Sequence, residues 1–285
     1  MLKSSNMEEY NSSDDCSAIE DYMIDNYHHT SPDIFYTATN IPGPGANTED
    51  FNTQFMGGCA CKEGRCHIEN NCPCVRKYGV NYDKNSRLLD SKFNGPIVEC
   101  NSMCGCNGRG RCGNRVVQFG PRGGLQVFEA SHSKGFGLKS ESILLKGDFI
   151  CEYAGEVLNM AEARSRAKAN VGKMNYIFVL NEHLSQGHVL KTYVDPTVIG
   201  NIGRYINHSC QPNAVVVPVR TDTPVPKLCI FALKEIHIGE EITFDYGGGN
   251  SNEVCSVQGG LMHRKSCCCG VEVCRKYLPY DETLF

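Results

Sequence analysis

The chain has 285 residues, of which 41% are apolar, and a formal net charge of −4. Its first residues are polar and acidic, unlike a secretory signal, and its longest apolar runs fall far short of the roughly 20 residues of a membrane span. We therefore expect a soluble intracellular protein of one or two domains, whose 18 cysteines are reduced.

Residues 1–50 are predicted to form a flexible N-terminal arm. They are mostly polar and contain a Pro-Gly break at residues 41–45. The short apolar run Ile34–Tyr36 is the exception, and we expect it to dock on the body of the protein.

Residues 51–118 hold nine cysteines and show little hydrophobic periodicity, so metal rather than a hydrophobic core must order them. A secreted disulfide scaffold is the alternative, but an odd number of cysteines and repeated Cys-x-Cys pairs favour zinc. Three tetrahedral zinc ions need twelve ligand positions, which nine thiolates supply if three of them each bridge two ions. The predicted ligands are Cys59, Cys61, Cys66, Cys72, Cys74, Cys100, Cys104, Cys106 and Cys112.

Residues 119–250 change to short β-like runs separated by Gly, Pro and Asn, which predicts a mostly β architecture of small sheets. One helix is predicted at Met160–Lys168, where Asn159 and Glu162 resemble a capping box. Between the two halves of the cysteine cluster, Lys77–Glu99 is predicted to be a loop.

Residues 251–285 are predicted to be a linker followed by a fourth zinc site. Cys267, Cys269 and Cys274 are one ligand short of a tetrahedron, and Cys210 is the expected fourth ligand. Cys268, between two proposed ligands, is expected to be a bystander. Ordinary thiols are expected at Cys16, Cys151, Cys229 and Cys255.

Zinc binding would change the charge of the protein. Thirteen thiolates holding four divalent ions would lower the net charge from −4 to about −9. Such a protein is not expected to bind nucleic acid through general cationic attraction, and no direct sequence-specific binding of nucleic acid is expected. It could attract a basic peptide.

The order of motifs resembles one enzyme family. Gly135-Phe136-Gly137, the run from Arg204 to Cys210, and Phe244-Asp245-Tyr246 lie between the two cysteine groups, as in SET-domain lysine methyltransferases of the suppressor-of-variegation class. This resemblance implies a SET-domain β-clip fold with a pseudoknot-like crossing near Asn207-His208. It also implies a pre-SET zinc segment at 51–118, a SET domain at 119–250 and a post-SET segment within 251–285.

Within the family, three segments are most similar to the SET–mariner fusion proteins, although no transposase segment is present here. They are Gly155-Glu156-Val157, Asn201-Ile202-Gly203-Arg204 and Val225-Pro226-Lys227-Leu228.

The resemblance also implies the site residues. The methyl donor would be S-adenosylmethionine, with adenine contacts from Asn207 and His208; the implied cofactor residues are Gly135, Phe136, Gly137, Tyr176, Arg204, Asn207, His208 and Tyr246. The acceptor lysine would enter from the opposite face through a channel lined by Tyr153, Phe178, Phe244 and Tyr277. Tyr246, with Tyr153 and Phe244, would be catalytic. Glycine lets backbone approach a cofactor closely, and aromatic faces stabilise a methylated ammonium.

The resulting hypothesis is a histone-lysine N-methyltransferase, in the nucleus on chromatin, acting on the histone H3 tail or the nucleosome. Lysine 9 is the class-typical target, and Phe244 implies di- or trimethylation. Lysine 36 or lysine 4 of histone H3 is the alternative target. Two alternative functions are an inactive chromatin-binding adaptor and a zinc-rich DNA-binding module. The acidic charge of the chain opposes the DNA-binding module. All predicted zinc sites are closed four-thiolate sites and therefore structural.

Overall fold

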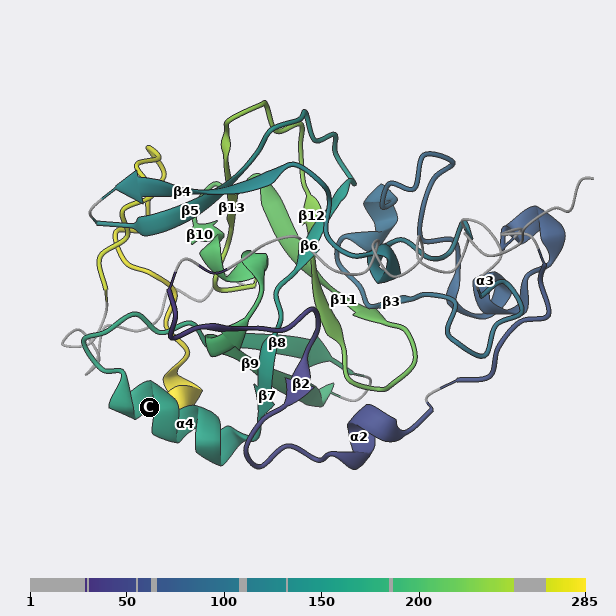
Figure 1. The fold of residues 1–285 in the computed structure, drawn as a ribbon, viewed down its shortest axis with the longest axis horizontal. Helices are drawn as coiled ribbons and strands as arrows, with labels where there is room; N and C mark the ends of the chain where they lie inside the picture. The colour runs from purple at the N-terminus through teal and green to yellow at the C-terminus, as the bar shows by residue number, and fades with distance from the viewer. Residues whose placement is uncertain are drawn as a thin grey trace, which may run out of the picture.

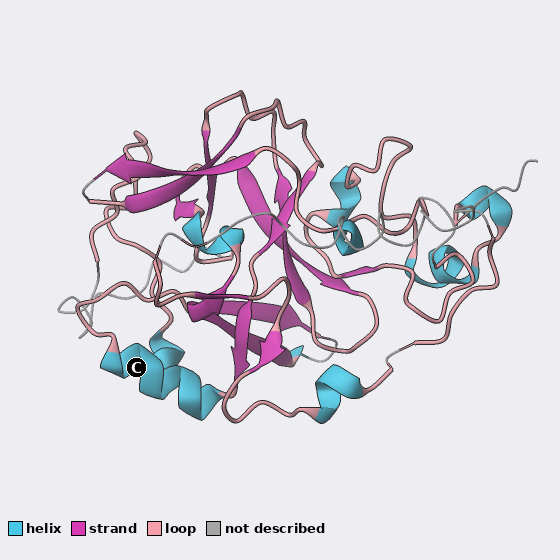
Figure 2. Ribbon diagram, in the orientation of Figure 1, coloured by secondary structure: helices cyan, strands magenta, loops and turns pink. Residues whose placement is uncertain are grey.

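The structure is a computed structural model that describes residues 29, 31–54, 56–62, 66–107, 112–131, 133–184, 187–248 and 265–285. Short strands in three small sheets dominate the described part, as predicted (Figure 2). Within it, no helix is long and apolar enough to cross a membrane. Figure 1 places the cysteine-rich segment and helix α3 (Pro73–Tyr78) at one end of the molecule, and the C-terminus beside α4 (Met160–Ala169) at the other.

The first sheet carries the N-terminal segment. Its members are β1 (Phe35–Tyr36), β9 (Val189–Gly200), β7 (Gly155–Leu158) and β2 (Ile41–Pro42), with β8 (Phe178–His183) paired to β9. The strands β1 and β2 run parallel to β9 and β7, respectively. The predicted docking of residues 35–36 is thus confirmed. Residues 41–42, within the predicted flexible arm, also pair with the body, whereas residues 1–28 lie outside the described part.

The second sheet brings the two most informative motifs together. It is formed by β10 (Asn207–His208), β13 (Glu241–Phe244), β5 (Gly135–Ser140) and β4 (Leu125–Ser131), in that order. Because β10 and β13 are parallel, His208 lies opposite Phe244. The Ser209 amide donates to the Phe244 carbonyl at 3.1 Å, which continues this pairing toward Tyr246.

The third sheet joins the cysteine-rich segment to the rest of the protein. Its strands are β3 (Ile97–Val98), β11 (Ala214–Arg220), β12 (Lys227–Ala232) and β6 (Phe149–Glu152). The strand β3 lies in the predicted Lys77–Glu99 loop and runs parallel to β11. That segment is therefore not wholly a loop.

A buried carboxylate reinforces the same junction. Glu99 is fully buried and accepts hydrogen bonds from the Tyr82 hydroxyl at 2.6 Å and the Val116 amide at 2.7 Å. The Val117 amide and the Gln118 side chain also donate to it, so its oxygens are well satisfied. Burial raises the pKa of this carboxyl, and the hydrogen bonds oppose that shift.

The helix α4 confirms the capping prediction and extends one residue beyond it. The Asn159 side chain accepts a hydrogen bond from the Glu162 amide at 2.8 Å, which satisfies one of the free donors of the first turn. Ala163 and Ala167, four residues apart, are its buried face. The remaining helical turns are α2 (Glu49–Asn52), η1 (Ile68–Asn70), η2 (Asp90–Lys92), η3 (Val117–Phe119), η5 (Ile202–Tyr205) and η7 (Glu282–Leu284).

Candidate active site and metal centres

Three of the predicted channel rings meet the ring of Tyr246 in the core of the protein. The centroid of the Phe244 ring lies 5.9 Å from that of Tyr153, 5.7 Å from that of Phe178 and 4.9 Å from that of Tyr246. Tyr153, Phe178 and Phe244 are each at most 5% exposed. They come from the ends of three strands, so long-range strand pairing builds this cluster.

The two tyrosine hydroxyls of the cluster are held by backbone. The Tyr246 hydroxyl donates to the Ile206 carbonyl at 3.0 Å, and the Tyr153 hydroxyl donates to the Tyr176 carbonyl at 2.6 Å. Burial raises the pKa of both phenols well above the ordinary value. Both hydroxyls therefore stay protonated at neutral pH, which excludes Tyr246 as a simple general base.

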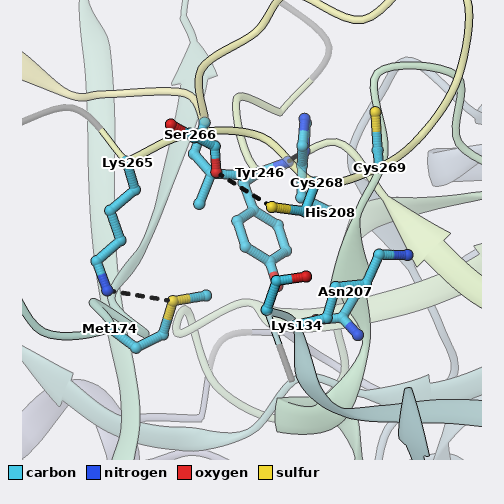
Figure 3. Close-up of a pocket in the computed structure, with 11 residues that line it drawn as sticks. Lys134, Met174, Asn207, His208, Tyr246, Lys265, Ser266, Cys268 and Cys269 are labelled. Carbon is cyan, nitrogen blue, oxygen red and sulfur yellow. Dashed lines mark hydrogen bonds between the residues drawn. The ribbon is translucent and has the colours of Figure 1, made fainter. Parts of the chain in front are cut away.

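Two cavities open on either side of Tyr246. The smaller pocket, of about 110 Å³, includes Asn207 and His208 in its lining (Figure 3). The larger cleft, of about 830 Å³, includes the aromatic cluster together with Tyr176 and Tyr277. Both cavities share the residues Met174, Tyr246, Lys265 and Leu278. Tyr246 thus lies where the two spaces meet.

The smaller pocket has a mixed lining that the sequence had not indicated. Ser133 and Lys134 precede β5, while Lys265, Ser266 and Leu278 come from the C-terminal segment. The Lys134 ammonium is paired with Glu241 at 2.9 Å, and the Lys265 ammonium lies 3.9 Å from the Met174 sulfur. Hydroxyls, an amide and ammonium groups thus lie beside the apolar Met174 and Leu278 in this pocket.

The His208 ring makes contacts within the chain through both of its nitrogens. Its Nδ1 accepts the Tyr246 amide proton at 3.2 Å, and its Nε2 lies 3.4 Å from the Cys210 sulfur. Burial lowers the pKa of His208 to about 4, so the ring is neutral at pH 7 and Nε2 carries its proton. Both ring nitrogens are thus engaged within the chain, and the ring orients Tyr246 and Cys210. The Asn207 amide donates to the Phe136 carbonyl at 3.0 Å and to Glu241 at 2.8 Å.

The glycines of the Gly-Phe-Gly motif are required by the local fold. Gly135 has a φ of +72°, a conformation that favours glycine. A Cβ at Gly137 would lie 2.9 Å from the Phe128 ring of β4, so this glycine permits strand packing. Neither residue lines the smaller pocket; Ser133 and Lys134, just before them, do.

Arg204 contacts a residue of the site without lining either cavity. Its guanidinium lies 4.6 Å from the centroid of the Tyr176 ring, and its Nε donates to the Pro196 carbonyl at 3.0 Å. The side chain is largely buried and lines neither cavity. Arg204 therefore positions Tyr176, which does line the larger cleft, by a cation–π contact.

The nine cysteines of residues 51–118 come together as overlapping groups of four sulfurs. In each group the sulfur atoms lie within 4.8 Å of one another. Sulfur atoms about 2.3 Å from a tetrahedral zinc ion are separated by roughly 3.8 Å, and the Cys59–Cys66 and Cys74–Cys104 sulfurs are 3.7 Å apart. The groups share sulfurs, Cys59 and Cys100 most often, as bridging thiolates would. The pKa of Cys100 is lowered, chiefly because the Cys112 thiol donates a hydrogen bond to it.

The C-terminal trio meets its predicted fourth partner. Sulfurs of Cys210, Cys267, Cys269 and Cys274 form one group, with 3.8 Å between the first two. Cys268 is exposed and outside this group, although it lines the smaller pocket. Cys151 and Cys229 are buried in β6 and β12 as predicted, whereas Cys16 and Cys255 lie outside the described residues.

Comparison with known proteins decides the family. The chain matches the model of the SET domain over residues 135–247 and that of the Pre-SET motif over residues 12–115. It is 44% identical over 259 residues to the histone-lysine N-methyltransferase SETMAR of Mus musculus, covering 88% of this chain and 82% of the relative. The chain belongs to the family of SET-domain histone-lysine N-methyltransferases. The resemblance inferred from sequence is confirmed.

Other members of this family are similar along most of the chain. The Su(var)3-9 methyltransferase of Drosophila melanogaster is 35% identical over 229 residues, which are 78% of this chain and 35% of the relative. The crystal structure of the human SETMAR methyltransferase domain matches with a TM-score of 0.74 and 42% identity, over 89% of this chain and 91% of that one. KRYPTONITE in complex with mCHH DNA, H3(1-15) peptide and SAH matches with a TM-score of 0.68 and 29% identity, over 87% of this chain and 48% of that one.

Proposed function

We propose that the protein transfers methyl groups from S-adenosylmethionine to lysine 9 of the histone H3 tail, with di- or trimethylated product. Support comes from Tyr246, which lines both the smaller pocket beside Asn207 and His208 and the larger cleft that contains the aromatic cluster. KRYPTONITE, a structural relative, was solved with an H3(1-15) peptide. That segment contains lysines 4 and 9 but not lysine 36, so lysine 4 is the stronger alternative target.

The residues that would hold the cofactor are Ser133, Lys134, Asn207, His208 and Tyr246, which line the smaller pocket. S-adenosylmethionine supplies an electrophilic methyl group on a sulfonium, whose departure as a neutral thioether needs little acid catalysis. The protein must therefore align and desolvate the acceptor rather than activate the donor. The Tyr246 hydroxyl, which donates to the Ile206 carbonyl, would accept a hydrogen bond from the acceptor amine and orient it.

The acceptor amine must lose its proton before it can attack. For a free lysine with a pKa of about 10.4, the neutral form costs roughly 4.6 kcal/mol at pH 7. An apolar channel lowers that cost because burial disfavours the charged form. The rings of Tyr153, Phe178 and Phe244, nearly inaccessible to water, would provide this environment.

Phe244 would set the degree of methylation. The residue is 1% exposed and its ring contacts Tyr153, Phe178 and Tyr246. A tyrosine hydroxyl at this position would hold a water in the channel and leave less room for a methylated amine. We expect Phe244→Tyr to shift the product toward monomethyl-lysine, as measured by mass spectrometry of the peptide product. An unchanged product ratio would contradict this role.

The test of the proposed function is a peptide array. The purified chain and labelled S-adenosylmethionine would be applied to tiled peptides of all four core histones, with a lysine-to-arginine copy of each peptide as the control. We expect label on the peptides that contain lysine 9 of histone H3. Label at lysine 4 or lysine 36 instead would reject the lysine 9 assignment, and no label on any histone peptide or on nucleosomes would reject the function.

Zinc binding, the domain division and the place of action in the cell complete the proposed function. Four structural zinc ions, three on the nine cysteines and one on the C-terminal group, fit the sulfur separations. We propose the division 51–118 pre-SET, 119–250 SET and 251–285 linker and post-SET. A role on nucleosomes in the nucleus follows from the proposed substrate.

A further inference from the structure

The carboxylate of Glu241, at the start of β13, connects two residues that line the smaller pocket (Figure 3). Its Oε1 accepts a hydrogen bond from the Asn207 side-chain amide at 2.8 Å, and its Oε2 lies 2.9 Å from the Lys134 ammonium. Glu241 itself lines neither cavity. Its contacts can therefore reach a ligand in the pocket only through the two side chains that it holds.

The hydrogen bonds of Asn207 fix the direction in which its amide group faces. The side-chain nitrogen donates to the Phe136 carbonyl at 3.0 Å as well as to Glu241. Both partners can only accept, so both protons of this nitrogen are used, and the flipped amide would place oxygen against oxygen. The amide oxygen of Asn207 therefore faces away from Glu241. It is the acceptor that Asn207 can offer to the pocket that it lines.

The Gly-Phe-Gly motif makes room for this arrangement. A Cβ at Gly137 would lie 3.1 Å from the Glu241 Oε1, in addition to its close approach to the Phe128 ring. Phe136, in the same motif, supplies the second acceptor for the Asn207 amide. A side chain at Gly137 would thus displace the carboxylate from Asn207.

The ion pair between Glu241 and Lys134 also affects the charge of the pocket. The two side chains are 23% and 21% exposed, so water screens their attraction only in part. The ammonium of Lys265 lines the same pocket. Without the carboxylate, Lys134 would add an unpaired positive charge, which repels the cationic sulfonium of S-adenosylmethionine. S-adenosylhomocysteine has a neutral thioether instead and would not be repelled in this way.

We propose that Glu241 is a positioning residue of the cofactor pocket, which holds Asn207 as a hydrogen-bond acceptor and keeps Lys134 paired. This inference rests on the proposed function, because the ligand is taken to be S-adenosylmethionine. Loss of the carboxylate frees the Asn207 amide to turn and leaves an ammonium unpaired beside a cationic ligand. Glu241 thus sets the affinity for the cofactor without touching the cofactor or the acceptor lysine.

The test compares two neighbouring glutamates. Glu241→Gln removes the charge and keeps the shape of the side chain. Glu240→Gln is the matched control, because that carboxylate lines neither cavity and accepts from the Asn213 side chain at 2.9 Å and the His237 amide at 3.0 Å. Asn207→Ala and the double variant with Glu241→Gln complete a mutant cycle. Calorimetry gives the Kd of S-adenosylmethionine and S-adenosylhomocysteine, and thermal unfolding without cofactor gives the stability of each variant.

We expect Glu241→Gln to weaken binding of S-adenosylmethionine about tenfold and of S-adenosylhomocysteine about threefold. In the Asn207→Ala background, Glu241→Gln should change the Kd of S-adenosylhomocysteine less than about twofold, because no amide remains to be oriented. The kcat at saturating S-adenosylmethionine should stay within about twofold of the wild type. The Tm should stay within about 2 °C of that of Glu240→Gln, which should bind both ligands as the wild type does.

Several results would overturn the inference and leave the proposed function intact. Unchanged affinities in Glu241→Gln would do so, as would the same loss with and without the Asn207 amide. A Tm for Glu241→Gln more than about 5 °C below that of Glu240→Gln would show a merely structural role. Equal losses for the two ligands would contradict the part assigned to Lys134. A wild-type protein that binds neither ligand would instead reject the proposed function, and this inference with it.

Discussion

Tyr246→Phe should lower kcat for methyl transfer about 100-fold, because it removes the hydroxyl oxygen that would accept a hydrogen bond from the acceptor amine and align it with the donor methyl. The hydroxyl lies between the two cavities and is held by the Ile206 carbonyl at 3.0 Å. The ring would remain, so packing against Phe244 and the fold should be kept. The measurement is single-turnover methylation of a histone H3 peptide with labelled S-adenosylmethionine.

Two controls separate chemistry from folding in this experiment. Tyr78→Phe makes the same chemical change in α3, outside both cavities, and should leave kcat unchanged. Cofactor affinity, measured by calorimetry, should stay within about threefold for Tyr246→Phe because the loss concerns the transition state. A kcat for Tyr246→Phe within tenfold of the wild type would contradict the proposed role.

Cys100→Ser should have the largest effect on stability. Cys100 belongs to three of the four overlapping sulfur groups among the described residues of the cysteine-rich segment, as expected of a bridging thiolate. A structural zinc site contributes about 10–16 kcal/mol, which is comparable to or larger than the roughly 5–15 kcal/mol that separates a folded domain from its unfolded state. We expect zinc content to fall from about four ions to one or two by elemental analysis, with loss of cooperative unfolding.

Cys61→Ser is the matched variant. Cys61 belongs to one sulfur group only and is partly exposed. Its replacement should remove at most one ion and leave a cooperative transition at a lower temperature. If Cys100→Ser and Cys61→Ser lost the same amount of zinc, Cys100 would not be a bridging ligand, and the three-ion arrangement would have to be redrawn.

Local rules were sufficient for several parts of the protein. The helix α4 begins where its capping pattern predicts, because a cap depends on residues three apart. The metal-site prediction depended on counting: nine thiolates fit three ions, and a trio needs a fourth ligand. The structure brings both sets of sulfurs together, including Cys210, which is 57 residues before Cys267.

Other features depended on the neighbours of each residue. The nitrogens of the His208 ring bond to the Tyr246 amide and the Cys210 sulfur. The missing side chain of Gly137 accommodates Phe128. Residues 41–42, within the predicted flexible arm, pair with β7. No local pattern specifies which side chain lies across a sheet.

The sequence by itself determined the family, the mostly β fold and the cysteines that come together in each cluster, because these follow from residue type and spacing. Only the tertiary structure decided that two cavities meet at Tyr246, that Ser133 and Lys134 line one of them, and that Leu284 fastens the end of the chain to α4. These features arise from contacts between segments far apart in the chain. The direction of each side chain there is set by strand pairing and packing, which spacing along the sequence does not encode.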